Sequence, residues 1–111
     1  MKAYEIKVIH SDAMDFVFAT NKKQAKMIAQ HNNGVFEDLD DLSPHDSLII
    51  THVEELDDRN DLSKLQIATW LIKHRNWWIY SQELDKFIDA DNVDCHQNIL
   101  EEELRKRENH V

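Results

Sequence analysis

Apolar and polar side chains alternate along the first part of the chain with the period of β-strands. Residues 3–9 place apolar side chains at alternate positions, and residues 14–19 follow a polar turn at 11–12 as the pairing partner. This period is typical of strands with one buried face, so the two segments predict a β-hairpin. Residues 47–53 are rich in β-branched side chains and predict a third strand.

Between the second and third of these segments the pattern changes to that of a helix. Thr20 or Asn21 can cap its N-terminus, and the Asn-Gly pair at 33–34 is a typical C-terminal stop. An acidic loop over residues 37–41 follows. The first half of the chain therefore predicts the order β-β-α-β, with the helix on one face of a small antiparallel sheet.

The second half has helical periodicity throughout. Ser63 and Gln66 have the spacing of a capping box, which is the clearest helix start in the chain. Ser81 can cap a second helix, and a polar interruption separates that helix from a third. The expected elements are helices over residues 63–74, 81–88 and 93–107, with an apolar connection over 77–80.

The complete pattern predicts an α+β fold, in which a small antiparallel sheet with one helix is followed by three helices. The polar segment 57–61 is the expected boundary, so that residues 1–58 and 59–111 form two halves packed as a single compact domain. The order of helices in the second half resembles a helix-turn-helix or winged-helix core, which implies a recognition helix beginning at Val93. Gln97 and Asn98 on that helix are natural base readers.

Composition supports long regular elements. The chain has 111 residues, with only one Gly and one Pro, which argues against barrels and sandwiches with many tight turns. No apolar run is long enough to span a bilayer, and the N-terminus enters a strand pattern without a signal-peptide core. Cys95 is the only cysteine, so no internal disulfide can form. A soluble cytoplasmic protein is expected, with no membrane association.

Acidic charge is concentrated in the first half. The chain has a formal net charge of −9, and residues 1–61 hold thirteen Asp and Glu against six Lys and Arg, which gives −7. A field of this sign repels phosphates and attracts basic surfaces, and it weakens as salt rises. The charge therefore favours a basic protein partner over direct binding of nucleic acid, and it also contributes to solubility.

The sequence lacks motifs for catalysis or metal binding. It has seven His but neither an H-E-x-x-H nor a C-x-x-C motif, and the adjacent pair Cys95 and His96 is badly spaced for one ion. The segment 89–94 resembles a calcium loop but lacks its Gly and its final Glu. A single Gly excludes a glycine-rich phosphate loop and a G-x-S-x-G elbow. We expect no enzyme activity, no metal ion and no cofactor.

Aromatic residues are clustered in the second half. Trp70, Trp77, Trp78 and Tyr80 lie within eleven positions, and such a cluster is typical of a core anchor. One or two of them could instead be exposed as a binding hot spot. Trp77 and Trp78 are the candidates for that role, because sequence neighbours do not easily face the same core.

The first half also resembles a group of small phage and prophage proteins. In these, a hairpin ending in Phe-Ala-Thr leads into a basic helix containing Ala, and a third strand leads to Glu-Leu-Asp. The corresponding segments here are Val17-Phe18-Ala19-Thr20, Lys22-Lys23-Gln24-Ala25-Lys26 and Glu55-Leu56-Asp57.

The resemblance implies an origin in a mobile element. Together with the acidic charge, it suggests an anti-CRISPR-like inhibitor that binds the basic groove of a host nucleic-acid-binding protein, with carboxylates in the place of phosphates. Two alternatives remain open. One is a helix-turn-helix DNA-binding regulator that uses Arg105, Lys106 and Arg107, and the other is a homodimeric structural accessory protein. The candidate partner-binding residues are Glu37, Asp38, Asp40, Asp41, Glu54, Glu55, Asp57, Asp58, Asp61, Trp77 and Trp78.

Overall fold

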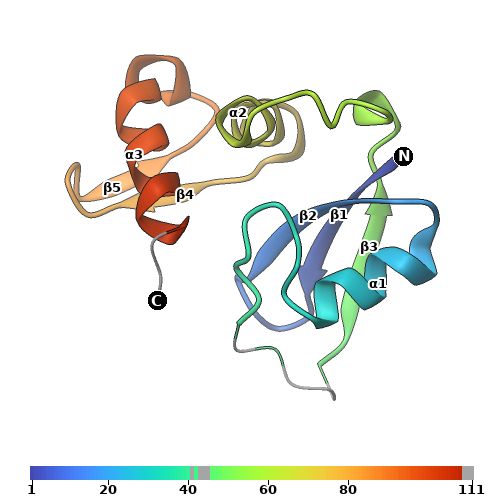
Figure 1. Cartoon of the computed structure of the whole chain (residues 1–111). Helices are drawn as coiled ribbons and strands as arrows, with labels where there is room; N and C mark the ends of the chain where they lie inside the picture. Colours follow the sequence, from blue (N-terminus) through green and yellow to red (C-terminus); the bar gives the residue numbers. More distant parts are fainter. Residues whose placement is uncertain (41, 43–45, 109–111) are drawn as a thin grey trace. The chain divides into compact units, whose positions relative to one another are not determined.

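A computed structural model describes residues 1–40, 42 and 46–108, with the side chains of Arg107 and Glu108 left out (Figure 1). The chain divides into two compact units, Met1–Asp61 and Leu62–Val111. The fold is mixed α+β, which confirms the predicted class. The predicted arrangement of three helices in the second half is wrong, because that half contains strands.

The first unit has the order β-β-α-β and ends in a short 3₁₀ turn. Its sheet has the order β2-β1-β3, with antiparallel pairing on both sides of the central strand. Tyr4 lies opposite Val17 on one neighbour and opposite His52 on the other. The elements are β1 (Lys2–Val8), β2 (Met14–Ala19), α1 (Lys22–Gln30), β3 (Leu48–His52) and the turn Glu54–Leu56.

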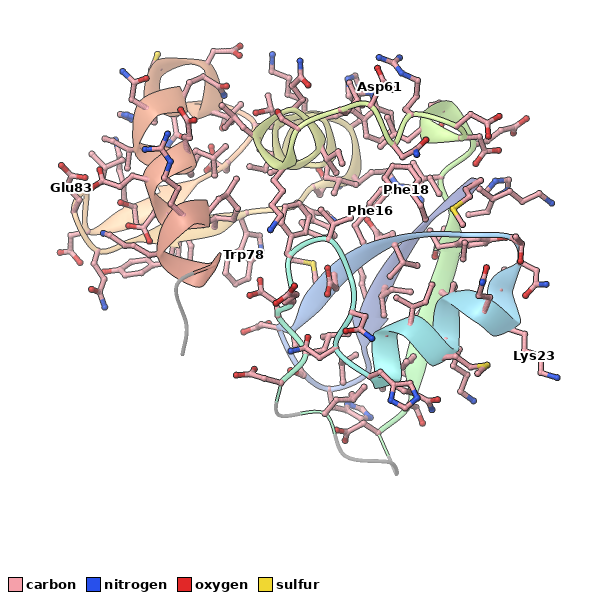
Figure 2. The ribbon with its side chains drawn as sticks, viewed as in Figure 1. Phe16, Phe18, Lys23, Asp61, Trp78 and Glu83 are labelled. Carbon is pink, nitrogen blue, oxygen red and sulfur yellow. The ribbon has the colours of Figure 1, made fainter. Side chains whose placement is uncertain are left out.

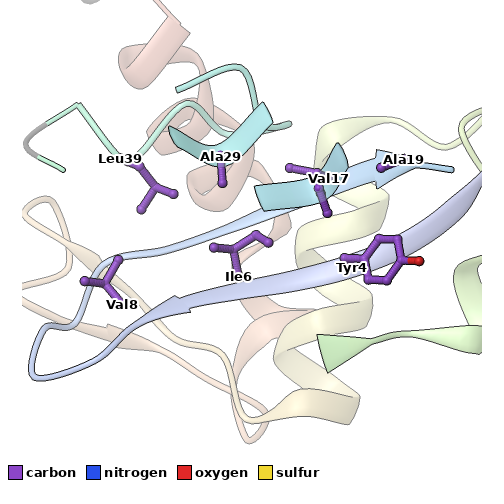
Figure 3. Close-up of a cluster of buried hydrophobic side chains, with 8 residues drawn as sticks. Tyr4, Ile6, Val8, Val17, Ala19, Ala29 and Leu39 are labelled. Carbon is purple, nitrogen blue, oxygen red and sulfur yellow. The ribbon is translucent and has the colours of Figure 1, made fainter. Parts of the chain in front are cut away.

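Alternation along the strands gives the sheet two different faces. Phe16 and Phe18 project from β2 on one face, with their rings edge to face at a centroid distance of 5.3 Å (Figure 2). The opposite face holds the hydrophobic core under α1 (Figure 3). Alanines on the inner side of the helix bring its backbone close to the sheet, because their side chains are short. The core comprises Tyr4, Ile6, Val8, Val17, Ala19, Ala25, Ala29 and Leu39.

Helix α1 begins where the sequence predicts, and it ends earlier than the sequence predicts. The Asn21 side chain accepts a hydrogen bond from the Gln24 backbone N–H at 2.9 Å, so Asn21 is the N-cap. The helix ends at Gln30 with His31 as its C-cap. The predicted stop at Asn33 and Gly34 is therefore wrong, and Gly34 does not have the positive φ of a glycine helix cap.

The second unit contains two helices and a hairpin. Helix α2 carries the predicted capping box and ends at Arg75, with Asn76 as its C-cap in a left-handed conformation. A two-stranded antiparallel sheet follows, and then a 3₁₀ turn leads into α3. The core of this unit is aliphatic, with Leu71, Ile88 and Leu100 fully buried. The elements are α2 (Lys64–Arg75), β4 (Ile79–Ser81), β5 (Lys86–Ile88), the turn Val93–His96 and α3 (Gln97–Glu108).

The predicted helix at Ser81 is wrong. The Ser81 hydroxyl does accept a hydrogen bond from the Leu84 N–H at 3.2 Å, as a helix cap would, but the bond closes a tight turn. Asp85 adopts φ 51° there, which reverses the chain and begins β5. The helix-turn-helix order is consequently not formed, because a hairpin lies between α2 and α3.

The Ser63 capping box provides a direct test of α2. Ser63→Ala removes the acceptor for the Gln66 N–H, which lies 3.1 Å from the hydroxyl, and we expect a loss of about 1 kcal/mol in unfolding free energy. The fluorescence of Trp70, which lies within this helix, reports the change in a urea titration. Gln66→Ala removes only the reciprocal bond to the Ser63 N–H, so it should cost less. An unchanged midpoint for Ser63→Ala would show that the cap does not stabilise α2.

Candidate functional site

A pocket opens in the first unit between the β1–β2 turn and the loop after α1. The turn is tight, since the Ser11 N–H donates to the Val8 carbonyl at 3.2 Å and the Val8 N–H donates to the Ala13 carbonyl at 3.2 Å. His10 lies at the tip of the turn with φ 65°, a conformation that few residues other than glycine adopt. On the other side, the Asn32 side chain accepts the Leu39 N–H at 2.9 Å and holds the loop.

Apolar and acidic side chains both line this pocket, which we call the acidic pocket. Its volume is about 660 Å³, within the range of small-molecule sites. Val8, Ala13 and Leu39 supply apolar surface, while Asp38 and Asp40 supply carboxylates from the loop. A ligand with an aliphatic stem and a positive charge would match both kinds of surface. The lining residues among those described are Val8, Ile9, His10, Ser11, Ala13, Asp38, Leu39, Asp40, Leu42, Asp46 and Ser47.

A buried carboxylate fastens the loop of the acidic pocket to the sheet. Asp15 is completely buried on β2, and its Oδ1 accepts the Phe16 N–H at 2.7 Å and the Phe36 N–H at 2.9 Å. The Val35 N–H adds a bond to the Phe16 carbonyl at 2.7 Å. These bonds hold residues 35–36 beside β2, two positions before Asp38.

Burial raises the pKa of the Asp15 carboxyl to about 6, although the N–H groups of Phe36 and Phe16 oppose the shift. The nearby charge of Asp38 raises the pKa further, and the Asp38 N–H lowers it. That N–H does not complete a hydrogen bond to Oδ2, which has no partner among the described residues. The carboxyl whose pKa is raised to about 6 therefore lies two residues after Ala13, which lines the pocket.

Gly34 is packed directly against this carboxylate. A Cβ at position 34 would lie 2.2 Å from Asp15 Oδ2 and 2.4 Å from its Cγ, far inside contact distance. Position 34 holds the only glycine of the chain. Its φ is not left-handed, so glycine is required there by the contact with Asp15 and not by the backbone conformation. Nothing in the local sequence around Asp15 or Gly34 signals this contact.

The structure gathers only some of the predicted acidic residues. Asp38 and Asp40 line the acidic pocket, and Glu37 is exposed on the same loop. Asp41 lies outside the described residues. Asp46 also lines the pocket, and sequence reasoning missed it because it lies beyond the acidic run.

The remaining predicted acids lie at the other end of β1. Glu54 and Glu55 are exposed in the 3₁₀ turn that follows β3. The pocket contacts the Val8 end of β1, and the segment 54–61 adjoins its Lys2 end. A strand of this length separates the two groups by about 20 Å at about 3.3 Å per residue. The acids of the pocket and those of the segment 54–61 therefore do not form one continuous acidic face.

Three acids in the segment 54–61 have intramolecular partners. Asp57 accepts the Ala3 N–H at 2.8 Å, and both of its oxygens lie 2.9 Å from His52 Nε2. The Ala3 bond is the main reason that the pKa of Asp57 is lowered. Asp58 bonds to the amino group of Met1, and Asp61 pairs with Arg59 at 3.2 Å. The bonds of Asp57 to Ala3 and of Asp58 to Met1 tie the segment to the start of β1.

The two candidate tryptophans have opposite surroundings. Trp77 is buried, whereas Trp78 is 39% exposed. Trp78, Tyr80 and Phe87 form what we call the aromatic face of the β4–β5 hairpin, and Figure 2 shows Trp78 on this unit. The Phe87 ring lies edge to face with Trp78 at 4.8 Å and with Tyr80 at 5.3 Å. Sequence reasoning missed Phe87, because the expected helix over residues 81–88 includes this residue, which lies in β5 instead.

Most of the residues considered for DNA binding form hydrogen bonds or ion pairs within the second unit. The Gln97 side chain donates to the Thr69 hydroxyl at 3.1 Å, which joins α3 to α2. Arg105 pairs with Glu101 at 3.1 Å, and Lys106 pairs with Glu103 at 3.4 Å. Asn98 is exposed. These pairs reduce the positive potential that a phosphate backbone would meet on α3.

Residues 1–40, 42 and 46–108 contain no group of three or more His, Cys, Asp and Glu arranged to hold a metal ion. Within the same residues, no helix is long and apolar enough to cross a membrane. The segment that resembles a calcium loop forms a turn instead. Asp89 Oδ1 accepts the Asp91 N–H at 3.0 Å, and the Asn92 side chain accepts the Asp89 N–H at 2.9 Å.

Comparison of the chain with protein-family models, with curated proteins and with solved structures gave no match. The resemblance to phage proteins remains a prediction from the sequence.

Proposed function

We propose that this protein is a non-catalytic binding protein whose acidic pocket holds a Lys or Arg side chain of a protein partner. The observation that supports the proposal is the combination of an apolar wall and three carboxylates in one pocket of about 660 Å³. A long basic side chain buries its methylene groups against apolar surface and keeps its charge near carboxylates. The pocket offers both surfaces to the same side chain.

The net charge of the first unit supports a basic partner. Residues 1–61 carry −7 at neutral pH, so the field around the pocket draws in a cationic surface and raises the association rate at low salt. A host nucleic-acid-binding protein with a basic groove is the specific partner that we propose, with the carboxylates of the pocket in place of phosphates. The protein would then inhibit that partner by occupying its groove, as an anti-CRISPR protein does.

The proposal predicts that neutralising the pocket weakens binding of a lysine peptide. The variant Asp40→Asn with Asp46→Asn removes two exposed carboxylates that line the pocket. At about 0.2–1 kcal/mol for each exposed ion pair, the dissociation constant of a synthetic Lys-Gly peptide should rise roughly two- to thirty-fold. Residue-resolved NMR titration measures this change, and the amide signals of the pocket should move in the unmodified protein.

A matched variant separates the pocket from overall charge. Glu54→Gln with Glu55→Gln makes the same change in net charge on exposed residues near the other end of β1. It should leave binding largely unchanged at moderate salt, because screening limits the reach of these charges to about 10 Å. Equal weakening by both variants would show that net charge, rather than the pocket, attracts the peptide.

The same variants test the natural partner. Capture from a lysate of the source cells, with a low-salt and then a high-salt wash, should release a basic nucleic-acid-binding protein at high salt. The pocket variant should capture less of it than the matched variant. Recovery of DNA without protein would contradict the proposal and support the DNA-binding alternative.

A further inference from the structure

We infer that the aromatic face of the second unit is a separate binding site for arginine side chains of a basic protein segment. Three large rings are exposed on it, with Trp78 39%, Tyr80 41% and Phe87 49% accessible to solvent. The rings form one continuous chain, because Phe87 contacts both of the others edge to face. The inference rests on different residues from the acidic pocket and does not depend on it.

The hairpin geometry explains why these rings are on the outside. Tyr80 lies directly opposite Phe87 in the β4–β5 register, so both project from the same face. Trp78 precedes Tyr80 by two positions and shares that face. Ile79 and Ile88 are the neighbouring pair on the opposite face, and both are buried. Burial of the aliphatic pair anchors the hairpin and leaves the aromatic pair in solvent.

Carboxylates accompany the aromatic rings. Asp85 accepts a hydrogen bond from the Tyr80 hydroxyl, which places this carboxylate at the edge of the aromatic face. Glu83 is exposed in the same turn. Lys86 lies opposite Ser81 in the register, and alternation therefore directs it to the other face of the hairpin. Asp85 therefore gives the edge of the aromatic face a negative charge, and Glu83 adds another in the adjoining turn.

The combination of π-faces and carboxylates selects a cation. A guanidinium group stacks on aromatic rings and forms paired hydrogen bonds with a carboxylate at the same time. Trp78 or Phe87 would supply the ring, and Asp85 or Glu83 would supply the carboxylate. Single-stranded nucleic acid also stacks on aromatic rings, but its phosphates would be repelled by these two acids. Charge complementarity therefore identifies a basic peptide segment as the ligand.

Residue-resolved NMR titration of the full chain with a synthetic Arg-Gly peptide tests the inference. We expect the side-chain indole signal of Trp78 and the amide signal of Phe87 to shift, and a Glu-Gly peptide to leave both unchanged. Trp78→Leu and Phe87→Leu keep apolar area but remove a π-face. Each should weaken binding at the hairpin by about two- to five-fold, the range of an exposed cation–π contact.

The titration separates this site from the acidic pocket. Shifts at Trp78 and Phe87 that persist in the Asp40→Asn, Asp46→Asn variant support the inference whether or not the pocket also responds. Shifts confined to the pocket would overturn the inference and leave the proposed function standing. Ile49→Leu, which replaces an exposed apolar residue of the first unit, is the control and should not change the hairpin signals.

Three other results would also overturn the inference. If Phe87→Leu binds the Arg-Gly peptide as well as the unmodified protein, the aromatic ring does not contribute. If sedimentation shows self-association that Trp78→Leu abolishes, a second copy of this chain covers the aromatic face instead. Preferential shifts with single-stranded DNA would identify a nucleic-acid site and contradict the charge argument.

Discussion

Gly34→Ala is expected to destabilise the first unit by about 3 kcal/mol. The new methyl group would lie 2.2 Å from Asp15 Oδ2, and this carboxylate is buried with two backbone N–H groups bonded to its other oxygen. Overpacking of a core costs about 1–3 kcal/mol, and a buried N–H that loses its acceptor costs about 1–3 kcal/mol more. Moving the Asp15 side chain to relieve the clash would release the Phe16 and Phe36 N–H groups.

The measurement must report on the first unit specifically. All three tryptophans of the chain, at positions 70, 77 and 78, lie in the second unit. Tryptophan fluorescence therefore does not directly follow unfolding of the first unit, and the two units need not unfold together. Hydrogen exchange of the β1 and β2 backbone amides in the native state provides the local free energy of opening.

A double-mutant cycle with Asp15→Ala isolates the cause. Asp15→Ala alone should destabilise the unit, because it leaves the Phe36 N–H without its acceptor. In that background Gly34→Ala should be neutral or should stabilise by about 0.4–1 kcal/mol, since the φ of Gly34 suits an L-residue. The expected coupling energy is about 3 kcal/mol. Equal destabilisation by Gly34→Ala in both backgrounds would mean that the contact with Asp15 is not responsible.

The unfolding free energy of the unmodified protein is expected to fall between about pH 4 and pH 6, and Asp15→Asn should remove most of this fall. The pKa of Asp15 is raised from 3.8 to about 6 by burial, so the folded state binds a proton in this interval and the unfolded state does not. Stability from this group is present below pH 3.8 and is lost as pH rises through about 6. At about 1.4 kcal/mol per pH unit, the total loss is about 3 kcal/mol.

Comparison of the variant with the unmodified protein gives the Asp15 contribution directly. An asparagine keeps an oxygen acceptor for the Phe16 and Phe36 N–H groups, so the loop should stay attached to β2. At pH 7 we expect the unfolding free energy of the variant to be close to that of the unmodified protein or higher. Towards pH 4 the variant should lose this advantage, because only the unmodified protein gains stability from protonation of residue 15. The amide group of Asn has its own burial cost, which shifts the plot of unfolding free energy against pH without changing its slope.

Two control variants make the pH result specific. Glu37→Gln removes one negative charge from an exposed residue of the loop after α1, and it should leave the stability change assigned to Asp15 in place. Asp57→Asn should act in the opposite direction, because the pKa of Asp57 is lowered and its contribution is lost as pH falls. A pH profile of Asp15→Asn that parallels the unmodified protein would show that Asp15 does not titrate near pH 6.

Asp15 connects these stability effects with the acidic pocket. Its carboxylate holds residues 35–36 against β2, and the same loop then supplies Asp38 and Asp40 to the pocket. Asp38 also raises the pKa of Asp15 through its charge. A cation bound at Asp38 would reduce that repulsion. The Asp15 variants should therefore change peptide binding at the pocket without altering any residue that lines it.

The sequence by itself determined the features that depend on neighbours along the chain. Alternation over residues 3–9 and 14–19 predicted the hairpin because a strand places every second side chain on one face. The capping box at Ser63 was predicted correctly, since its bonds join residues three positions apart. The acidic excess of the first half is likewise a property of composition.

Tertiary structure decided the features that depend on residues distant in sequence. Ser81 has the local signal of a helix cap, yet burial of Ile79 and Ile88 favours a hairpin, and that choice also exposes Trp78 and buries Trp77. The sequence left open whether its acidic residues share one face, and β1 separates those of the pocket from those of the segment 54–61. Gly34 reads as a helix stop, whereas its contact is a carboxylate nineteen positions earlier. Local patterns favour a backbone conformation, but only the packed chain determines whether it forms, which side chains meet and which lose water.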